Sequence, residues 1–160
     1  MRKQKGFSLI ELLIVVAIIL IIAAIAIPNL LKSRIAANEA SAVGSVRSIN
    51  TAEVTYSATY PDTGFALALT NLGGTSTGTA SSASAGLLDS VLSSGTKSGY
   101  KFVAAGSNGG TGTINTQYTV TAIPLNTGTT GQRSFYSDQS GVIRYNTSGS
   151  APASTDPPLQ

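Results

Sequence analysis

The sequence predicts an α+β fold in which one long N-terminal helix packs on a four-stranded antiparallel sheet. Three observations lead to this prediction. An apolar segment lies near the N-terminus, an amphipathic pattern of helical period follows it directly, and β-rich segments occupy the C-terminal part of the chain. Four antiparallel strands with one apolar face need a cover, and the amphipathic part of the helix supplies it.

The composition of the 160 residues excludes several kinds of site. The chain has no Cys and no His, which excludes disulfides, thiol nucleophiles, imidazole bases and Cys/His zinc sites. The seven carboxylates show no catalytic spacing, so we expect neither an enzyme nor a cofactor. The net charge of +3 comes from Arg2, Lys3 and Lys5, and beyond Gly6 seven basic side chains balance seven acidic ones. A balanced body gives no reason to expect a nucleic-acid partner.

The N-terminal part combines a basic leader, residues 1 to 6, with an apolar segment, residues 7 to 31. The run from Leu12 to Ile27 is unbroken over 16 residues. A helix of 25 residues is about 37 Å long, which is enough to cross a hydrocarbon core of about 30 Å. Because the positive residues precede the apolar segment, we expect a single membrane pass with a cytoplasmic N-terminus.

Residues 32 to 61 continue the helix as an amphipathic segment. Only Gly44 interrupts the helix formers between Pro28 and Pro61, and Pro61 opens a turn. The apolar residues expected on one face are Ile35, Ala42, Val46, Ile49, Tyr56 and Tyr60. The polar residues expected mostly to face away are Lys32, Glu39, Arg47, Asn50 and Glu53.

The rest of the chain divides into a connector, residues 62 to 98, and a sheet region, residues 99 to 160. The connector is rich in Ser, Thr, Gly and Ala, with a short helix predicted within residues 86 to 92. Asp138-Gln139-Ser140-Gly141 predicts a hairpin turn, and the C-terminal tail is expected to be loose. The predicted strands are residues 100–104, 118–123, 135–137 and 142–145.

The junction Lys5-Gly6-Phe7-Ser8-Leu9-Ile10-Glu11 carries the most specific signal in the chain. A short basic leader that ends in Gly, followed by Phe-Ser-Leu-Ile-Glu and an apolar helix, resembles the signal of bacterial type IV pilins and type II secretion pseudopilins. The resemblance covers residues 1 to about 31 closely. It implies that a prepilin peptidase cleaves between Gly6 and Phe7 and that Phe7 becomes the N-methylated first residue.

Glu11 requires a physical explanation because it is a carboxylate within an apolar segment. Such a group costs about 2.5–3.5 kcal/mol at the centre of a membrane helix. Cleavage after Gly6 creates a cation, the α-amine of Phe7, one helical turn away. Glu11 is therefore expected to neutralise this amine or that of an adjacent subunit, which would fix the register of assembly. A carboxylate that simply lies near the lipid headgroups is the alternative.

Pro28 is expected to bend or locally open the helix, because proline lacks the backbone N–H and collides with the preceding turn. The resemblance implies a weak point where the helix extends in a filament. The alternative is that Pro28 only marks the exit from the membrane.

Two other interpretations of the N-terminus stay open. Ala24-Ile25-Ala26 is a possible cleavage site of an ordinary secretory signal peptide, and an uncleaved signal anchor is the other. Elsewhere, Asp138 in its turn suggests a calcium loop, but it is the only carboxylate there, so no metal site is expected. Asn146-Thr147-Ser148 fits a glycosylation sequon, which occurs often by chance.

The resemblance implies a structural subunit of a type IV pilus-like filament. Its partners would be membrane lipid before assembly, copies of itself in a helical homopolymer, the prepilin peptidase, and an assembly platform and ATPase in the inner membrane. The subunit would be stored in the inner membrane and end in an extracellular filament. A major pseudopilin of a type II secretion system and a minor tip pilin that acts as an adhesin are the alternatives.

Overall fold

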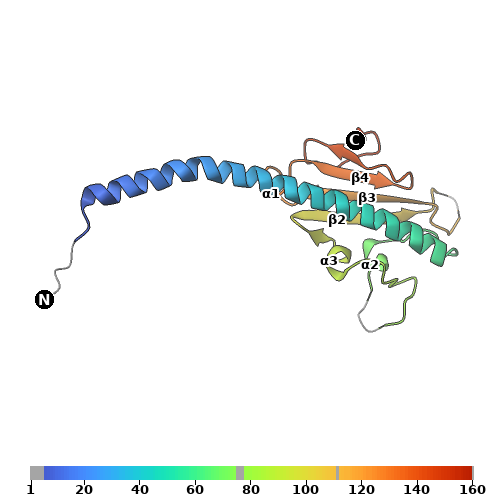
Figure 1. Cartoon of the computed structure of the whole chain (residues 1–160). Coiled ribbons are helices and arrows are strands. Elements are labelled where there is room, and N and C mark those ends of the chain that lie inside the picture. The colour runs from blue at the N-terminus through green and yellow to red at the C-terminus, as the bar shows by residue number, and fades with distance from the viewer. Residues whose placement is uncertain (1–5, 75–77, 111, 160) are drawn as a thin grey trace. The chain divides into compact units, whose positions relative to one another are not determined.

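The computed structural model describes residues 6–74, 78–110 and 112–159 (Figure 1). The chain divides into two compact units, Met1–Arg34 and Ile35–Gln160. The long helix α1 (Leu9–Thr59) has 51 residues and contributes to both units. The predicted long helix is confirmed, and it begins and ends two residues inside the expected segment of residues 7 to 61.

The second unit contains a five-stranded sheet in which every neighbouring pair is antiparallel and the strands follow chain order. The α+β fold with an antiparallel sheet is confirmed, but the predicted number of four strands is wrong. The strands are β1 (Thr96–Lys97), β2 (Tyr100–Ser107), β3 (Gln117–Pro124), β4 (Ser134–Asp138) and β5 (Arg144–Asn146).

The additional strand, β1, has only two residues and pairs with β2 through a tight turn at Ser98 and Gly99. Both turn residues have positive φ, 50° and 74°, as a two-residue hairpin of this kind requires. Two residues show no alternation of apolar and polar side chains. The sequence pattern therefore cannot reveal this strand.

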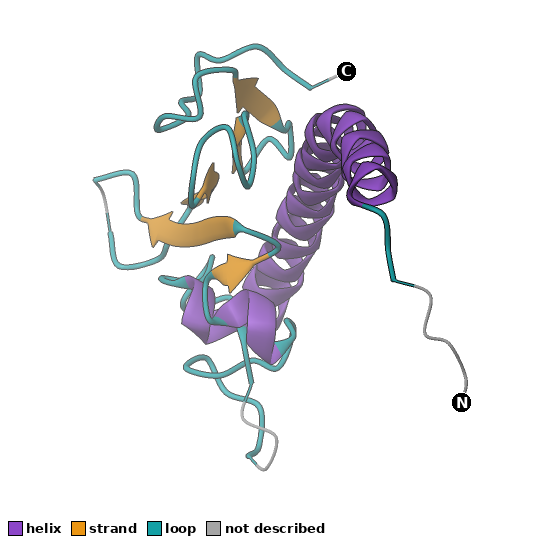
Figure 2. Ribbon diagram, turned by 90° about the vertical axis from the view of Figure 1, so that its left-hand side faces the viewer, coloured by secondary structure: helices purple, strands orange, loops and turns teal. Residues whose placement is uncertain are grey.

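In the second unit α1 lies against one face of the sheet (Figures 1 and 2), and both contribute residues to the core. Alternate residues of β2 and β3 are buried, because successive side chains of a strand point to opposite faces. The helix contributes apolar residues at intervals of three and four. The largest fully buried apolar side chains are Ile49, Tyr56, Leu72, Leu92, Tyr100, Tyr118 and Phe135.

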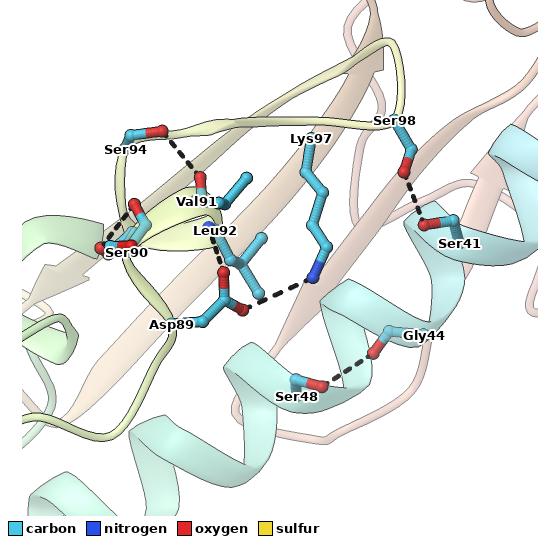
Figure 3. Close-up of polar contacts among 11 residues, drawn as sticks. Ser41, Gly44, Ser48, Asp89, Ser90, Val91, Leu92, Ser94, Lys97 and Ser98 are labelled. Atoms are coloured by element: carbon cyan, nitrogen blue, oxygen red, sulfur yellow. Dashed lines mark hydrogen bonds and ion pairs between the residues drawn. The ribbon is translucent and has the colours of Figure 1, made fainter.

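The connector contains two short helices, α2 (Leu69–Leu72) and α3 (Ser90–Ser93). A helix was predicted within residues 86 to 92, and α3 lies at the end of that segment, whereas α2 was not predicted. Asp89 caps α3 by accepting a hydrogen bond from the backbone N–H of Leu92 at 2.9 Å. It also pairs with Lys97 at 3.4 Å (Figure 3).

The hairpin turn predicted at Asp138–Gly141 is confirmed. The N–H of Gly141 donates to the carbonyl of Asp138 at 2.9 Å, and Gly141 has a φ of 72°. The following strand begins at Arg144, two residues later than expected.

The C-terminal tail, which is expected to be loose, makes backbone hydrogen bonds to β5 and to the residue before it. The N–H of Tyr145 donates to the carbonyl of Pro157 at 3.0 Å, and the N–H of Leu159 donates to that of Ile143 at 2.7 Å. The tail is held because β5 is an edge strand, whose backbone groups on one side would otherwise have no partner in the sheet.

Several hydroxyl groups on the exposed surface of α1 bond to the carbonyl of the preceding helical turn. Each lies within 2.8–3.1 Å of the carbonyl oxygen four residues earlier. The residues concerned are Ser33, Ser48, Thr51, Thr55 and Thr59. Ser and Thr in this position satisfy their hydroxyl group within the helix.

Candidate processing and assembly segment

The junction between leader and helix is non-helical. Gly6, Phe7 and Ser8 precede α1, which starts at Leu9, and the carbonyl of Ser8 accepts a hydrogen bond from Leu12 N–H at 3.1 Å. Both Gly6 and Phe7 are exposed, and a Cβ added at Gly6 would meet nothing within 4 Å. The peptide bond between them is accessible, and the fold itself does not require glycine there.

The apolar residues of the first unit cover no core of their own. Among the described residues 6–34, only Ala23 is partly buried and all others are exposed. Among the residues that the structure describes, α1 is the one helix long and apolar enough to cross a membrane, and its most apolar stretch of 18 residues is entirely unburied. An apolar helix of this kind needs lipid or other apolar helices around it.

Glu11 lies in the first turn of α1 and is exposed. A carboxylate there is favoured by the helix dipole. Across the described ranges, ion pairs form between Lys97 and Asp89 and between Arg133 and Glu39, and none involves Glu11. Phe7 lies two residues before the helix, so the pairing of its α-amine with Glu11 stays a prediction.

Pro28 lies inside α1, and the helix continues through it without a break. Proline donates no backbone hydrogen bond, so the turn around Pro28 has one bond fewer than the rest of the helix. A weaker turn at this position is therefore part of the structure. Its role as a kink stays a prediction.

Glu39 is buried, contrary to the expectation that it mostly faces away. Its Oε1 accepts hydrogen bonds from the N–H groups of Gln132 and Arg133 at 2.9 and 3.0 Å, and its Oε2 accepts one from Nε of Arg133 at 2.8 Å. Burial raises the pKa of Glu39, but these three donors outweigh burial and hold the pKa below its ordinary value. The carboxylate joins α1 to the loop before β4.

Glu53 is fully buried, which also contradicts the expectation. Its Oε2 accepts a hydrogen bond from the N–H of Ala66 at 2.8 Å, and its buried Oε1 has no hydrogen-bond partner among the residues that the structure describes. Burial raises the pKa of Glu53 to about 7, although the Ala66 hydrogen bond acts in the opposite direction. Glu53 joins α1 to the segment that follows the helix.

The spacing of Glu39 and Glu53 along the sequence indicates that both lie on the buried face of the helix. Intervals of three and four residues connect Glu39 and Glu53 with the apolar residues of the buried face, and such intervals keep side chains on one side of a helix. The full series is Glu39, Ala42, Val46, Ile49, Glu53 and Tyr56, all of them buried.

The Asp138 loop shows the geometry of a turn. Oδ1 of Asp138 accepts a hydrogen bond from the N–H of Ser140 at 2.9 Å. Within residues 6–74, 78–110 and 112–159, no group of three or more His, Cys, Asp or Glu residues lies close enough to hold a metal ion.

Comparisons with known proteins match one family model and several relatives, each over part of the chain. Residues 1–27 match a family model described as the prokaryotic N-terminal methylation motif. The chain is 67% identical over 39 residues to the type IV wide pilus major component PilA4 of Thermus thermophilus. It is 44% identical over 54 residues to the type IV major pilin protein PilA of Myxococcus xanthus, and 43% identical over 79 residues to a fimbrial protein of Pseudomonas aeruginosa.

These matches cover 24%, 34% and 44% of this chain. The chain spans 30%, 24% and 51% of the length of these relatives. No solved structure matches the chain. The resemblance to type IV pilins is thus confirmed, with the methylation motif placed at residues 1–27.

Proposed function

We propose that the chain is a structural subunit of a type IV pilus-like filament. It is held in the inner membrane by residues 7–31, with the N-terminus in the cytoplasm. A prepilin peptidase cleaves between Gly6 and Phe7 and methylates the α-amine of Phe7. An inner-membrane platform and its ATPase then transfer the subunit from lipid into a homopolymer.

The observation that carries this proposal is the unburied apolar half of α1 directly after an exposed Gly6-Phe7 bond. A helix that is apolar all round is accommodated equally by lipid and by other apolar helices, so transfer between the two is nearly balanced in free energy. The methylation motif matched over residues 1–27 supports processing at this junction. Because the space around Gly6 is open, the fold does not require glycine there, which supports a glycine selected for recognition by another protein.

The relatives favour a pilus over the two alternative roles. Two of them are named as major pilus components, which favours a major pilus subunit over a secretion pseudopilin or a minor adhesive tip pilin. Electron microscopy of cells with and without the chain separates the roles. Loss of long filaments from cells that lack the chain supports a major pilin. Intact filaments on such cells would contradict it.

The mature N-terminus tests the processing step. We expect mass spectrometry of the membrane and filament fractions to find a chain that begins with N-methylated Phe7. A chain that begins at Ile27 would identify an ordinary signal peptide, and one that retains Met1 would identify an uncleaved anchor. Either result would overturn the proposal.

A further inference from the structure

The β5 edge of the sheet is covered by the chain's own C-terminal tail, which we define as residues 156–159. β5 is the last strand in the sheet order. On its outer side, Tyr145 N–H donates to the carbonyl of Pro157 at 3.0 Å, and the carbonyl of Ile143 accepts from Leu159 N–H at 2.7 Å. The tail thus occupies main-chain groups that an open edge would offer to another strand.

Side chains also hold the tail in place. Nη1 of Arg144 donates to the carbonyl of Asp156 at 3.0 Å, and Nδ2 of Asn146 lies 3.4 Å from Oδ1 of Asp156. At the other end, Leu159 is partly buried against the core cluster. The tail is therefore anchored at both ends to β5 and the residues next to it.

The outward side of the tail offers no free main-chain donor. Arg144 and Pro158 are opposite each other in an antiparallel bridge whose hydrogen bonds flank the pair. In such a pair the main-chain groups of both residues point away from each other. The N–H that would point outward belongs to Pro158, and proline has none. The N–H of Asp156 donates within a turn to Ala153 at 3.1 Å.

The opposite edge of the sheet is protected in another way. β1 has two residues and ends in Lys97, and a very short edge strand with a lysine is a poor template for pairing. β5 is also short, but without the tail the outward groups of Ile143 and Tyr145 would lack partners. The two edges thus differ in that β5 depends on a separate segment.

We propose that residues 156–159 are an edge cap, and that an uncapped β5 pairs antiparallel with β5 of a second copy. Pairing centred on Tyr145 joins the two outward groups of this residue to the same groups of the second copy, in an isologous contact. It also places Arg144 opposite Asn146, so the two arginines do not lie directly opposite each other. The cap keeps the sheets of neighbouring copies apart, and its action requires neither processing nor filament formation.

The test compares four versions of the chain in detergent micelles, three of 160 residues and one truncated. They are the wild type, a chain that ends at Thr155, Pro158→Val and Pro157→Val. Pro158→Val introduces an outward N–H and leaves the cap in place, so that the tail itself becomes an edge with which a second copy can pair. Pro157→Val is the matched control. The carbonyl of Pro157 faces β5, so the backbone N–H that valine introduces at this position faces β5 as well.

Light scattering gives the protein mass per micelle at increasing concentration. We expect the truncated chain to show about twice the wild-type mass, as a two-fold contact requires. Pro158→Val should show the same increase at higher concentration, and Pro157→Val should match the wild type. A synthetic peptide of residues 153–160 in excess should return the truncated chain to the wild-type mass.

Wild-type mass for both the truncated chain and Pro158→Val, with native near-ultraviolet circular dichroism, would overturn the proposal. An equal increase in Pro157→Val would also overturn it, because loss of either proline would then suffice. If truncation unfolds the second unit, the comparison of Pro158→Val with Pro157→Val decides. Because the assay uses neither the peptidase nor filaments, failure of the proposed function does not change its outcome.

Discussion

At the scale of single residues, two carboxylates connect α1 to distant parts of the second unit in opposite electrostatic situations. Glu39 has three donors on its two oxygens, including the guanidinium of Arg133. Within the described part of the chain, Glu53 has one backbone donor and no ion pair, and its other oxygen is buried without a partner. The free-energy cost of burying the carboxylate is thus offset by hydrogen bonds and an ion pair at Glu39, and largely not offset at Glu53.

Glu53 should make the stability of the second unit depend on pH. Its pKa rises from 4.5 to about 7 on folding, so between these values the folded state holds a proton that the unfolded state releases. The free energy of unfolding should therefore fall as pH rises from about 4.5 to about 7, by about 3 kcal/mol at most. Glu53→Gln should remove this dependence and be more stable than the wild type at pH 8.

Thermal unfolding of wild type and Glu53→Gln at pH 5 and pH 8 measures this effect. Asp89→Asn is the control, because Asp89 is a surface carboxylate whose pairing with Lys97 is exposed. A wild-type protein as stable at pH 8 as at pH 5 would contradict the prediction.

The two carboxylates also show what sequence analysis can and cannot derive at this scale. Their spacing from Val46 and Ile49 placed them on the buried face, but a charged side chain is almost never fully buried without a partner. The partners of Glu39 are the backbone N–H groups of Gln132 and Arg133, more than 90 residues away. No local sequence pattern contains these donors. The charge of the two side chains therefore predicted an exposed position, although their spacing indicated a buried one.

At the scale of elements, α1 stabilises the second unit through one face only. Ile49 is completely buried on this face, whereas Val54 on the same helix is 60% exposed. Ile49→Ala should lower the free energy of unfolding by about 2–5 kcal/mol, because it removes buried methyl groups and leaves a cavity. Val54→Ala should change it by less than about 0.5 kcal/mol.

Denaturant unfolding of the two variants in detergent tests this prediction. Both residues lie within α1, and both are replaced by alanine. A difference in stability between the two variants therefore reports packing and not helix propensity. Similar midpoints for the two variants would show that α1 is not held on the sheet by this face.

The elements that could be predicted are those that carry a long periodic pattern or strong turn chemistry. The helix, the two long strands and the Asp138–Gly141 hairpin belong to this group. β1, α2 and the pairing of the tail do not, because each involves only two to four residues. Such short pieces are determined by the tertiary contacts around them, which no local pattern encodes.

At the scale of the whole molecule, Glu11 should matter for assembly and not for processing. It lies five residues beyond Gly6, outside the bond that we propose is cleaved, and it has no ion pair with any described residue. Glu11→Ala should be cleaved normally but give few or no filaments, because the α-amine of Phe7 then enters an apolar layer unpaired. Immunoblots measure cleavage, and electron microscopy measures filament yield.

Glu11→Asp provides a control that keeps the charge on a shorter side chain, and we expect it to recover part of the filament yield. Normal filament yield from Glu11→Ala would contradict the role given to this carboxylate.

Gly6 should matter for processing and not for the fold. Since a Cβ at Gly6 meets nothing within 4 Å, Gly6→Leu should leave the second unit unchanged and leave uncleaved precursor in the membrane. Gly44→Leu is the matched control, because Gly44 is also surrounded by open space but lies far from the junction. Immunoblots of membrane fractions should show precursor for Gly6→Leu and mature chain for Gly44→Leu.

The hydroxyl groups that bond back along α1 affect the cost of moving this helix between different surroundings. Removing water from a polar group costs free energy mainly when the group loses a hydrogen bond. Ser33, Ser48, Thr51, Thr55 and Thr59 already have a carbonyl of their own helix as acceptor. These five hydroxyl groups therefore give up water at little cost, and their hydrogen bonds stay the same whether water, lipid or protein surrounds the helix.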